Sequence, residues 1–171
     1  MIIRQAERSD ASALSDLATQ TYTDAFGHSF SADDLAAEIR ANMSEACFDR
    51  YIDEDVVLIG EIDGRAVGYV QFGSVGAAVD AASAGDRELR RVHVRPGFQG
   101  QGIGRRLMDA AFDHPHLKGA RSVYLEVWER NHGAQRFYRR YGFEVIGARR
   151  FEVASGAPTD LDLIMVRRSA T

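Results

Sequence analysis

The sequence has little cysteine, no long hydrophobic run and no excess of basic residues. Cys47 is the one cysteine among 171 residues, so the chain cannot form an internal disulfide, which predicts a reducing, cytoplasmic compartment. No apolar run approaches the roughly 18 residues of a membrane span, and the first residues show no signal-peptide pattern. The formal net charge of −4 argues against a general nucleic-acid binder, because such surfaces are normally basic.

The composition is that of a globular protein. Hydrophobic residues make up 45% and charged residues 27% of the chain, and the length suits a single domain over residues 1–171. Apolar periodicity and turn signals predict strands over 2–6, 56–62, 66–72, 88–94, 122–128, 143–151 and 161–166, and helices starting at Ser9 or Asp10 and at Ser31, and over 46–52, 102–112 and 133–141. This order predicts an α/β fold in which helices cover a mixed sheet.

Turn residues divide these elements. The pair Asp63 and Gly64 suits a two-residue turn between two alternating strands, so a β-hairpin is expected there. Gly142 is expected to end the last helix, and Asn131 to cap its start. Small residues dominate 73–85, which we interpret as a mobile loop, and a second loop is expected around 156–158.

Glycines at 97, 100, 102 and 104 separate the strand 88–94 from the helical pattern that starts at Ile103. A strand that leads through such a turn into a helix leaves several unpaired main-chain N–H groups at one point, where the helix dipole favours an anion. Because glycine has no Cβ atom, a phosphate can approach the main chain closely. The sequence therefore predicts a phosphate-binding turn.

Two common nucleotide-binding motifs do not fit this turn. A P-loop needs Lys and then Ser or Thr after its last glycine, whereas Gly102 is followed by Ile103 and Gly104. A dinucleotide-binding turn needs a glycine where Arg105 or Leu107 stands. The phosphate ligand must therefore be bound through another pattern.

The remaining pattern, Gln99-x-x-Gly102-x-Gly104, resembles the Q/R-x-x-G-x-G/A motif of the GNAT superfamily of N-acetyltransferases. A second block over 125–143, LEVWERNHGAQRFYRRYGF, is similar to the N-x-x-A-x-x-F-Y-x-x-x-G-F signature of that family. Together with the closing DLIMV, it most resembles the bacterial spermidine/spermine N-acetyltransferase-like branch. The resemblance implies a single-domain GNAT fold of the α/β (α+β) class, with a mixed, mostly antiparallel sheet of about seven strands flanked by about four helices.

The resemblance also implies acetyl-CoA as the co-substrate, with its diphosphate held by the glycine turn. Main-chain groups of Val92 and Val94 would bind the pantetheine arm and polarise the thioester, and Arg105 would add a charge that suits phosphate. No metal site is expected. The residues implied in coenzyme binding are Val92, Val94, Gln99, Gly100, Gln101, Gly102, Ile103, Gly104, Arg105, Asn131, Ala134 and Tyr138.

Acetyl transfer needs a base for the amine and a proton for the departing thiolate. Tyr138 stands where the family places a tyrosine near the coenzyme sulfur, so it is the candidate general acid. Glu88, on the same strand parity as Val92, is our preferred candidate for the base. Glu126 on the next strand and His93, acting through water, remain alternatives.

The acceptor site is less well marked. Tyr22, Phe26 and His28, with Glu126, are the candidate acceptor-binding residues. The leading hypothesis is direct acetylation of a primary amine of a small molecule, with a polyamine as one candidate because acidic residues such as Asp24 and Glu38 would attract one. The alternatives are an acetyltransferase for protein N-termini or amino sugars, and a non-catalytic acyl-CoA sensor. No nucleic-acid or membrane partner is expected, and both a monomer and a homodimer stay open.

Overall fold

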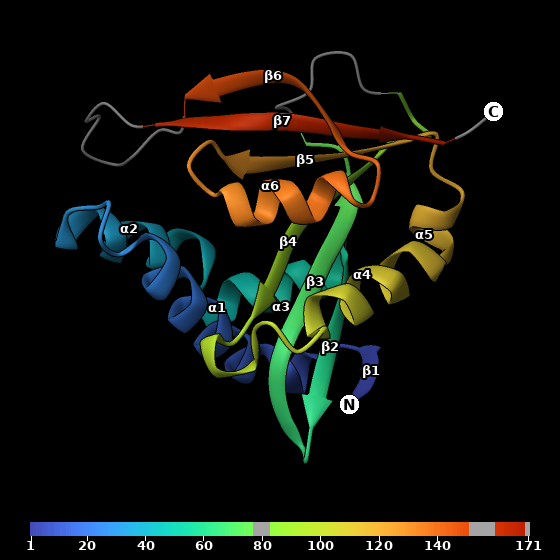
Figure 1. Cartoon of the computed structure of the whole chain (residues 1–171). Coiled ribbons are helices and arrows are strands. Elements are labelled where there is room, and N and C mark those ends of the chain that lie inside the picture. Colours follow the sequence, from blue (N-terminus) through green and yellow to red (C-terminus); the bar gives the residue numbers. More distant parts are fainter. Residues whose placement is uncertain (77–82, 151–159, 170–171) are drawn as a thin grey trace. The chain divides into compact units, whose positions relative to one another are not determined.

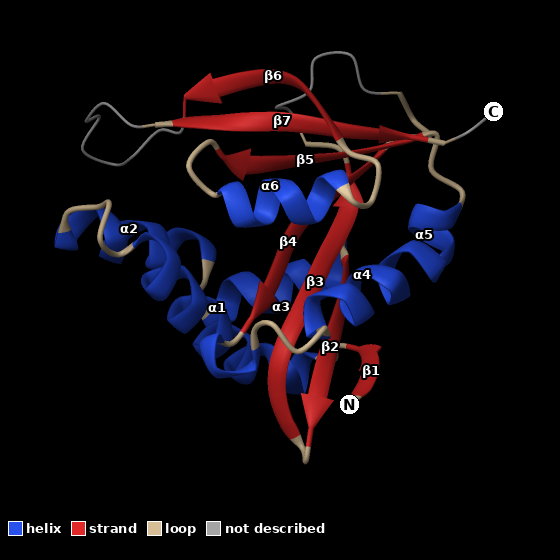
Figure 2. Ribbon diagram, in the orientation of Figure 1, coloured by secondary structure: helices blue, strands red, loops and turns tan. Residues whose placement is uncertain are grey.

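The computed structural model describes residues 1–76, 83–150 and 160–169. Figure 1 labels their helices and strands, and Figure 2 distinguishes the two kinds of element by colour. The strands are β1 (Ile2–Gln5), β2 (Val56–Ile62), β3 (Arg65–Ser74), β4 (Arg87–Val94), β5 (Ser122–Trp128), β6 (Glu144–Arg150) and β7 (Leu161–Arg168). The helices are α1 (Ala11–Phe26), α2 (Ala32–Asn42), α3 (Glu45–Glu54), α4 (Ile103–Asp113), α5 (Pro115–Lys118) and α6 (His132–Arg139).

These strands form one hydrogen-bonded order, β1-β2-β3-β4-β5-β7-β6. The pairs β1–β2, β2–β3, β5–β7 and β6–β7 are antiparallel, whereas β4 and β5 run parallel. The mixed, mostly antiparallel sheet expected from the sequence is therefore confirmed. The chain divides into two compact units, which we call unit 1 and unit 2. The first half of β4 belongs to unit 2 and its second half to unit 1.

Unit 1 comprises Met1–Phe72 and Arg91–His114. Its core forms where α1 and α3 pack against β2 and β3, with Leu14, Leu17 and Phe48 fully buried. The predicted hairpin is confirmed, because Asp63 and Gly64 have φ values of 51° and 73°, the left-handed conformation that a two-residue turn of this type requires.

Unit 2 comprises Gly73–Arg90 and Pro115–Thr171. Strand β5 is central in it: Arg87 and Glu88 of β4 pair with one edge, and β7 pairs along the other. Gly142, with a φ of 82°, follows α6 and leads the chain into β6, as the sequence predicts. Buried apolar residues fill the interior of this unit: Val123, Leu125, Phe143 and Met165.

The structure departs from the sequence-based expectation in a few places. Helix α5 was not expected, and with it the described residues contain six α-helices rather than about four. Asp10 precedes α1 but makes no side-chain cap, because its carboxylate instead accepts hydrogen bonds from Arg4 at 2.7 and 2.8 Å. Strand β3 extends to Ser74, and the rest of the expected loop at 73–85 lies partly outside the described residues, as does the loop at 156–158.

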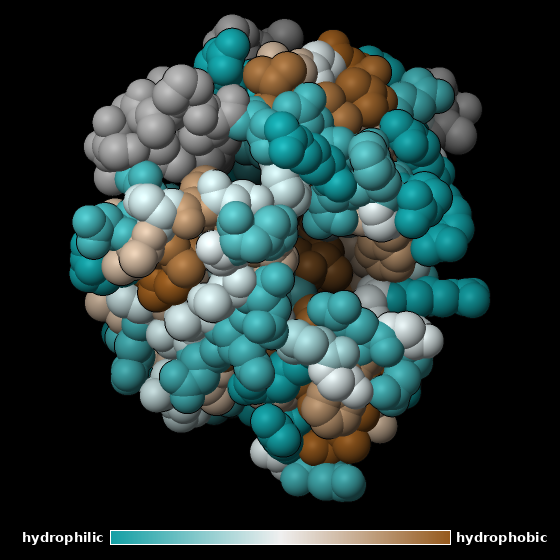
Figure 3. Space-filling view, turned by 60° about the vertical axis from the view of Figure 1, so that its left-hand side comes forward, coloured by the Kyte–Doolittle hydropathy of each residue, from teal (hydrophilic) through white to brown (hydrophobic). Residues whose placement is uncertain are grey.

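Within the part of the chain that the structure describes, no helix is long and apolar enough to cross a membrane. The face drawn in Figure 3 is mostly hydrophilic, with separate hydrophobic areas between the polar ones.

Candidate active site

The glycine turn lies in unit 1 between β4 and α4. Gly100 and Gly102 have φ values of 74° and 78°, a left-handed conformation that strongly favours glycine. A Cβ atom added at either position would meet no atom within 4 Å. Open space therefore lies beside the main chain at both glycines.

The main-chain N–H groups of residues 100–104 donate to no acceptor within the described ranges. They precede or open α4, so the positive end of the helix dipole coincides with them. The side chains of Gln99 and Gln101 bond back to the chain, to the carbonyl oxygens of Val94 at 3.0 Å and of Gly97 at 3.1 Å. The turn thus presents a row of donors with the character of an anion site. That this anion is a coenzyme diphosphate stays a prediction.

In the second half of β4, the main-chain groups of alternate residues point to opposite sides of the strand. The N–H of Arg95 donates to the carbonyl of Val67 on β3 at 2.9 Å, so Val92 and Val94, at alternate positions, direct their main-chain groups to the opposite edge. The described ladder between β4 and β5 pairs Arg87 and Glu88 and includes neither valine. That these main-chain groups bind the pantetheine arm stays a prediction.

A close approach of β3 to β4 requires glycine at Gly68. A Cβ atom there would lie 2.7 Å from the carbonyl oxygen of His93, which is closer than any normal contact. This glycine therefore sets the position of β4 within unit 1.

His93 is held by Thr21 of α1. The Thr21 hydroxyl lies 2.7 Å from Nδ1 of His93 and 2.9 Å from the carbonyl oxygen of Leu17. This contact fixes the orientation of the imidazole ring against α1. Burial, and secondly the charge of Arg91, lower the pKa of His93 to about 3. The imidazole is therefore neutral near pH 7.

The candidate general acid, Tyr138, lies on α6 in unit 2. Its ring packs against Phe143, with the centroids 6.0 Å apart, and burial raises its pKa to about 12. Asn131 caps this helix as predicted, because its Oδ1 accepts from the N–H of Ala134 at 3.0 Å. The hydroxyl of Tyr138 thus remains protonated at neutral pH.

Two of the three candidate bases lie in unit 2, and each accepts hydrogen bonds from an arginine. One carboxylate oxygen of Glu88 accepts from the N–H of Gly76 at 2.8 Å and from Arg90 at 3.0 Å. Glu126 accepts two hydrogen bonds from Arg149 of β6, at 2.9 and 2.6 Å. Both carboxylates are already oriented by donors.

The structure adds Asp162 of β7, which the sequence analysis did not single out. It pairs with Arg149 in the β6–β7 ladder, and burial, followed by the charge of Glu126, raises its pKa to about 6. Hydrogen bonding to Glu126 and the charges of Asp162 and Glu88 raise the pKa of Arg149. Arg149, Glu126, Asp162 and Glu88 therefore form one electrostatically coupled group, which we call the Arg149 cluster.

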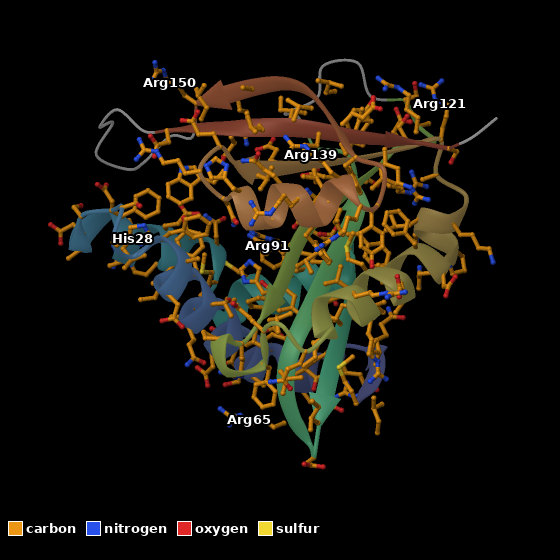
Figure 4. The ribbon with its side chains drawn as sticks, viewed as in Figure 1. His28, Arg65, Arg91, Arg121, Arg139 and Arg150 are labelled. Atoms are coloured by element: carbon orange, nitrogen blue, oxygen red, sulfur yellow. The ribbon has the colours of Figure 1, made fainter. Side chains whose placement is uncertain are left out.

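The predicted acceptor residues are divided between the two units. Tyr22 and Phe26 lie on α1 with ring centroids 4.7 Å apart, and Tyr22 also packs against the core of unit 1. His28 follows α1 and is exposed; Figure 4 labels it near the end of that helix. Glu126 lies in unit 2, in the Arg149 cluster. Their role in acceptor binding stays a prediction.

Arg105 of the predicted phosphate site is an exposed residue of α4, and its Nε lies 3.6 Å from a carboxylate oxygen of Asp109. Sequence reasoning did not select Arg91 and Tyr69 of unit 1. Arg91 donates to Oε1 of Gln71 at 2.6 Å, and the ring of Tyr69 packs against His93 with the centroids 5.2 Å apart. The signal for Arg91 was its alternation with His93 along one strand, which places both side chains on the same face.

Comparison with known proteins gives consistent results. Residues 12–143 match the family described as the acetyltransferase (GNAT) family. An uncharacterized N-acetyltransferase of Mycobacterium tuberculosis is 32% identical over 160 residues, which cover 92% of this chain and 97% of that protein. A shorter stretch of 98 residues is 37% identical to an uncharacterized N-acetyltransferase of Methanocaldococcus jannaschii, covering 54% of this chain and 40% of that protein.

Solved structures show the same fold. The PaiA N-acetyltransferase from Thermoplasma acidophilum, in complex with coenzyme A, superposes with a TM-score of 0.77 at 20% identity, covering 98% of each chain. The ribosomal-protein-S18-alanine N-acetyltransferase from Escherichia coli superposes with a TM-score of 0.72 at 20% identity, covering 99% of this chain and 94% of that one. These likenesses confirm the expected α/β fold with its seven-stranded mixed sheet.

Proposed function

Because the chain belongs to the acetyltransferase (GNAT) family, we propose that it transfers an acetyl group from acetyl-CoA directly to a primary amine of a small molecule. The observation that carries this proposal is the row of main-chain N–H groups at residues 100–104, beside two left-handed glycines with open space around them. The coenzyme A in the solved T. acidophilum structure supports the same choice of co-substrate.

Binding would depend mainly on the main chain of unit 1. The N–H groups at residues 100–104 suit a diphosphate, because several donors and the helix dipole act on one anionic group. Main-chain groups of Val92 and Val94 would hold the pantetheine arm in the manner of an added strand. The glycines keep side chains away from both.

The acceptor must lose a proton before it can attack. An amine with a pKa near 10.4 is neutral in only about one molecule in several thousand at pH 7, which corresponds to roughly 4 to 5 kcal/mol. Glu88 is the proposed base, with Glu126 and the neutral imidazole of His93, acting through water, as alternatives. The neutral amine then forms a bond to the thioester carbon, the carbon–sulfur bond breaks and the thiolate leaves; the nitrogen loses a second proton as the amide forms, and the thiolate takes up one proton to give free coenzyme A.

Tyr138 would stabilise the departing thiolate. A phenol with a pKa of about 12 is a weaker acid than a thiol, whose pKa is near 8.5, so full transfer of its proton would cost about 5 kcal/mol. Tyr138 therefore acts by donating a hydrogen bond to the sulfur as negative charge develops there, and the proton moves only if the phenolate is at once reprotonated.

A thiol-release assay with acetyl-CoA tests this function. The acceptor panel contains spermidine, because of the resemblance to the spermidine/spermine-like branch, together with amino acids, an amino sugar and a short peptide with a free N-terminus. Release that depends on one class of small amine supports the proposal. Tight binding of acetyl-CoA without release for any amine would instead favour a sensor, and preferential use of the peptide would favour a protein acetyltransferase.

A further inference from the structure

A second polar group lies in unit 1, on the face of β4 covered by the early helices. Arg91 and His93 project from this face of β4, Tyr69 and Gln71 from β3, and Tyr51 from α3. Figure 4 labels Arg91 on β4. Arg91 and Tyr69 have no role in the acetyl transfer proposed for this chain, although both side chains are costly to bury.

The hydroxyl of Tyr69 is the first unexplained feature. Tyr69 is fully buried, and its oxygen has no hydrogen-bond partner within the described residues. Its ring is fixed by edge-on packing against Phe48, with centroids 5.6 Å apart, and by contact with His93 at 5.2 Å. A buried hydroxyl without a partner costs about 1 to 3 kcal/mol, so a group that completes its hydrogen bonding is expected.

The second feature is the guanidinium of Arg91. It donates to Oε1 of Gln71 at 2.6 Å and lies over the ring of Tyr51, 4.7 Å from the centroid. Gln71 is oriented for this task, because its amide nitrogen donates to Asp55 at 2.6 Å. Within the described ranges, no carboxylate oxygen lies within 4.0 Å of a nitrogen of Arg91. A mostly buried guanidinium is thus rigidly held without a direct counter-ion.

The ionisable groups around Arg91 hold no carboxylate in direct contact with it within the described ranges. Glu38 of α2 is the carboxylate that interacts with Arg91 at longer range, and burial raises the pKa of Glu38. His93 is neutral, and Tyr69, which interacts electrostatically with Arg91, is protonated because burial raises its pKa. The carboxylate of Glu38 itself accepts a hydrogen bond from Asn42 at 2.7 Å.

We propose that Arg91 and Tyr69 form a carboxylate-binding subsite, so that the acceptor is a small amine that also carries a carboxylate group, such as an amino acid. A guanidinium fork and a hydroxyl donor match the two oxygens of a carboxylate. Arg91 directly precedes Val92 on β4, so the proposed subsite and the proposed pantetheine-binding residues belong to the same strand. The inference rests on the proposed function and names its substrate class.

The test compares amino acids with their carboxamides as acceptors in the thiol-release assay, with spermidine as a third kind of acceptor. For the best amino acid, we expect kcat/KM to exceed that of its amide by about a hundredfold, as for a buried charged pair. In Arg91→Gln this preference should fall to near unity, because only the charged acceptor loses a partner.

Tyr69→Phe removes a hydroxyl that has no partner inside the protein. We therefore expect an unchanged or higher melting temperature together with a rise of about tenfold in KM for the amino acid. This combination cannot arise from a merely structural tyrosine, and the variant remains informative if Arg91→Gln folds poorly. Arg50→Gln is the matched control: Arg50 also lies over the Tyr51 ring, at 5.2 Å, but is exposed and paired with Glu54.

The outcomes are distinct. If the wild-type protein uses amides or spermidine as well as amino acids, or if Tyr69→Phe leaves KM unchanged, the subsite is wrong while the proposed function stands. If no amine of any kind is acetylated, the proposed function is wrong and the subsite falls with it. Selective use of amino acids, lost in Arg91→Gln and kept in Arg50→Gln, supports both.

Discussion

The glycine turn of unit 1 and the Arg149 cluster of unit 2 expose polar groups in two different ways. The turn offers main-chain N–H groups, which carry no titratable charge and need only glycine conformations to be presented. The cluster offers ionisable side chains from four strands, coupled around one guanidinium. If both act as proposed, binding of the phosphate should be insensitive to pH and to most side chains, whereas proton transfer should depend on each charge.

The largest effect is expected where a charge enters the turn. Gly102→Glu should reduce acetyl-CoA affinity by at least a hundredfold, because a carboxylate would compete with the diphosphate for the same donors. Isothermal titration calorimetry measures this directly.

Two variants control for the side effects of Gly102→Glu. Gly102→Asn keeps a residue that tolerates the left-handed conformation and adds no charge, so it should retain most of the affinity. Gly97→Glu adds the same charge at a glycine with open space and an ordinary φ, outside the row of donors, and should bind nearly normally. Equal affinity in Gly102→Glu and the wild type would remove the phosphate assignment.

The second prediction concerns Tyr138 in unit 2. Tyr138→Phe should lower kcat by about a hundredfold while the dissociation constant of acetyl-CoA stays the same, because the hydroxyl acts only when charge develops on the sulfur. Steady-state kinetics and calorimetry on the same preparation separate the two quantities. Wild-type turnover in this variant would assign Tyr138 to packing against Phe143.

The candidate bases give a smaller effect. Glu88→Gln should lower kcat/KM about tenfold or more near pH 7, with the deficit shrinking as pH rises toward 10, because the amine then loses its proton without help. A pH–rate profile from 6 to 10 shows this change of slope. Glu126→Gln, which removes the other carboxylate of the Arg149 cluster, is the comparison. If it shows the deficit and Glu88→Gln does not, the base is Glu126.

Much of the fold could be predicted because it is specified by local patterns. The hairpin at 63–64 depends on two residues with positive φ, and α4 on apolar residues at helical spacing after a glycine. Helix α5 could not be predicted in this way, since a helix of four residues has no periodicity to detect. The glycine turn was equally local, which is why its place between β4 and α4 could be predicted from the sequence.

The side-chain groups were harder to predict because they depend on register. Arg149 meets Asp162 through the pairing of β6 with β7, which includes an irregularity between Val145 and Gly147, and a shift of one residue would turn these side chains to the other face. Arg91 likewise meets Tyr51 and Gln71 from two other elements. Sequence spacing carries no information on such encounters.

The smallest effect that we expect concerns the charge coupling in unit 2, and it is measured as a change in the free energy of unfolding with pH. The pKa of Asp162 is about 6 in the folded protein and near 3.9 in an unfolded chain, so unfolding releases a proton between these values and stability falls as pH rises through them. Asp162→Asn removes this loss. It should match the wild type near pH 4 and be more stable above pH 6, by about 1 kcal/mol after discounting for partial exposure.

Thermal unfolding of both proteins from pH 4 to 8 measures the difference. Asp113→Asn, at an exposed position at the end of α4, is the control and should follow the wild type at every pH. Acetyl-CoA affinity should not follow this change in stability. Because we expect the affinity to depend on main-chain donors of the glycine turn, it should be the same in Asp162→Asn and in the wild type. If the stability of Asp162→Asn ran parallel to that of the wild type over this pH range, the pKa of Asp162 would not be raised by folding. The Arg149 cluster would then hold no proton on the Asp162 carboxyl above pH 4.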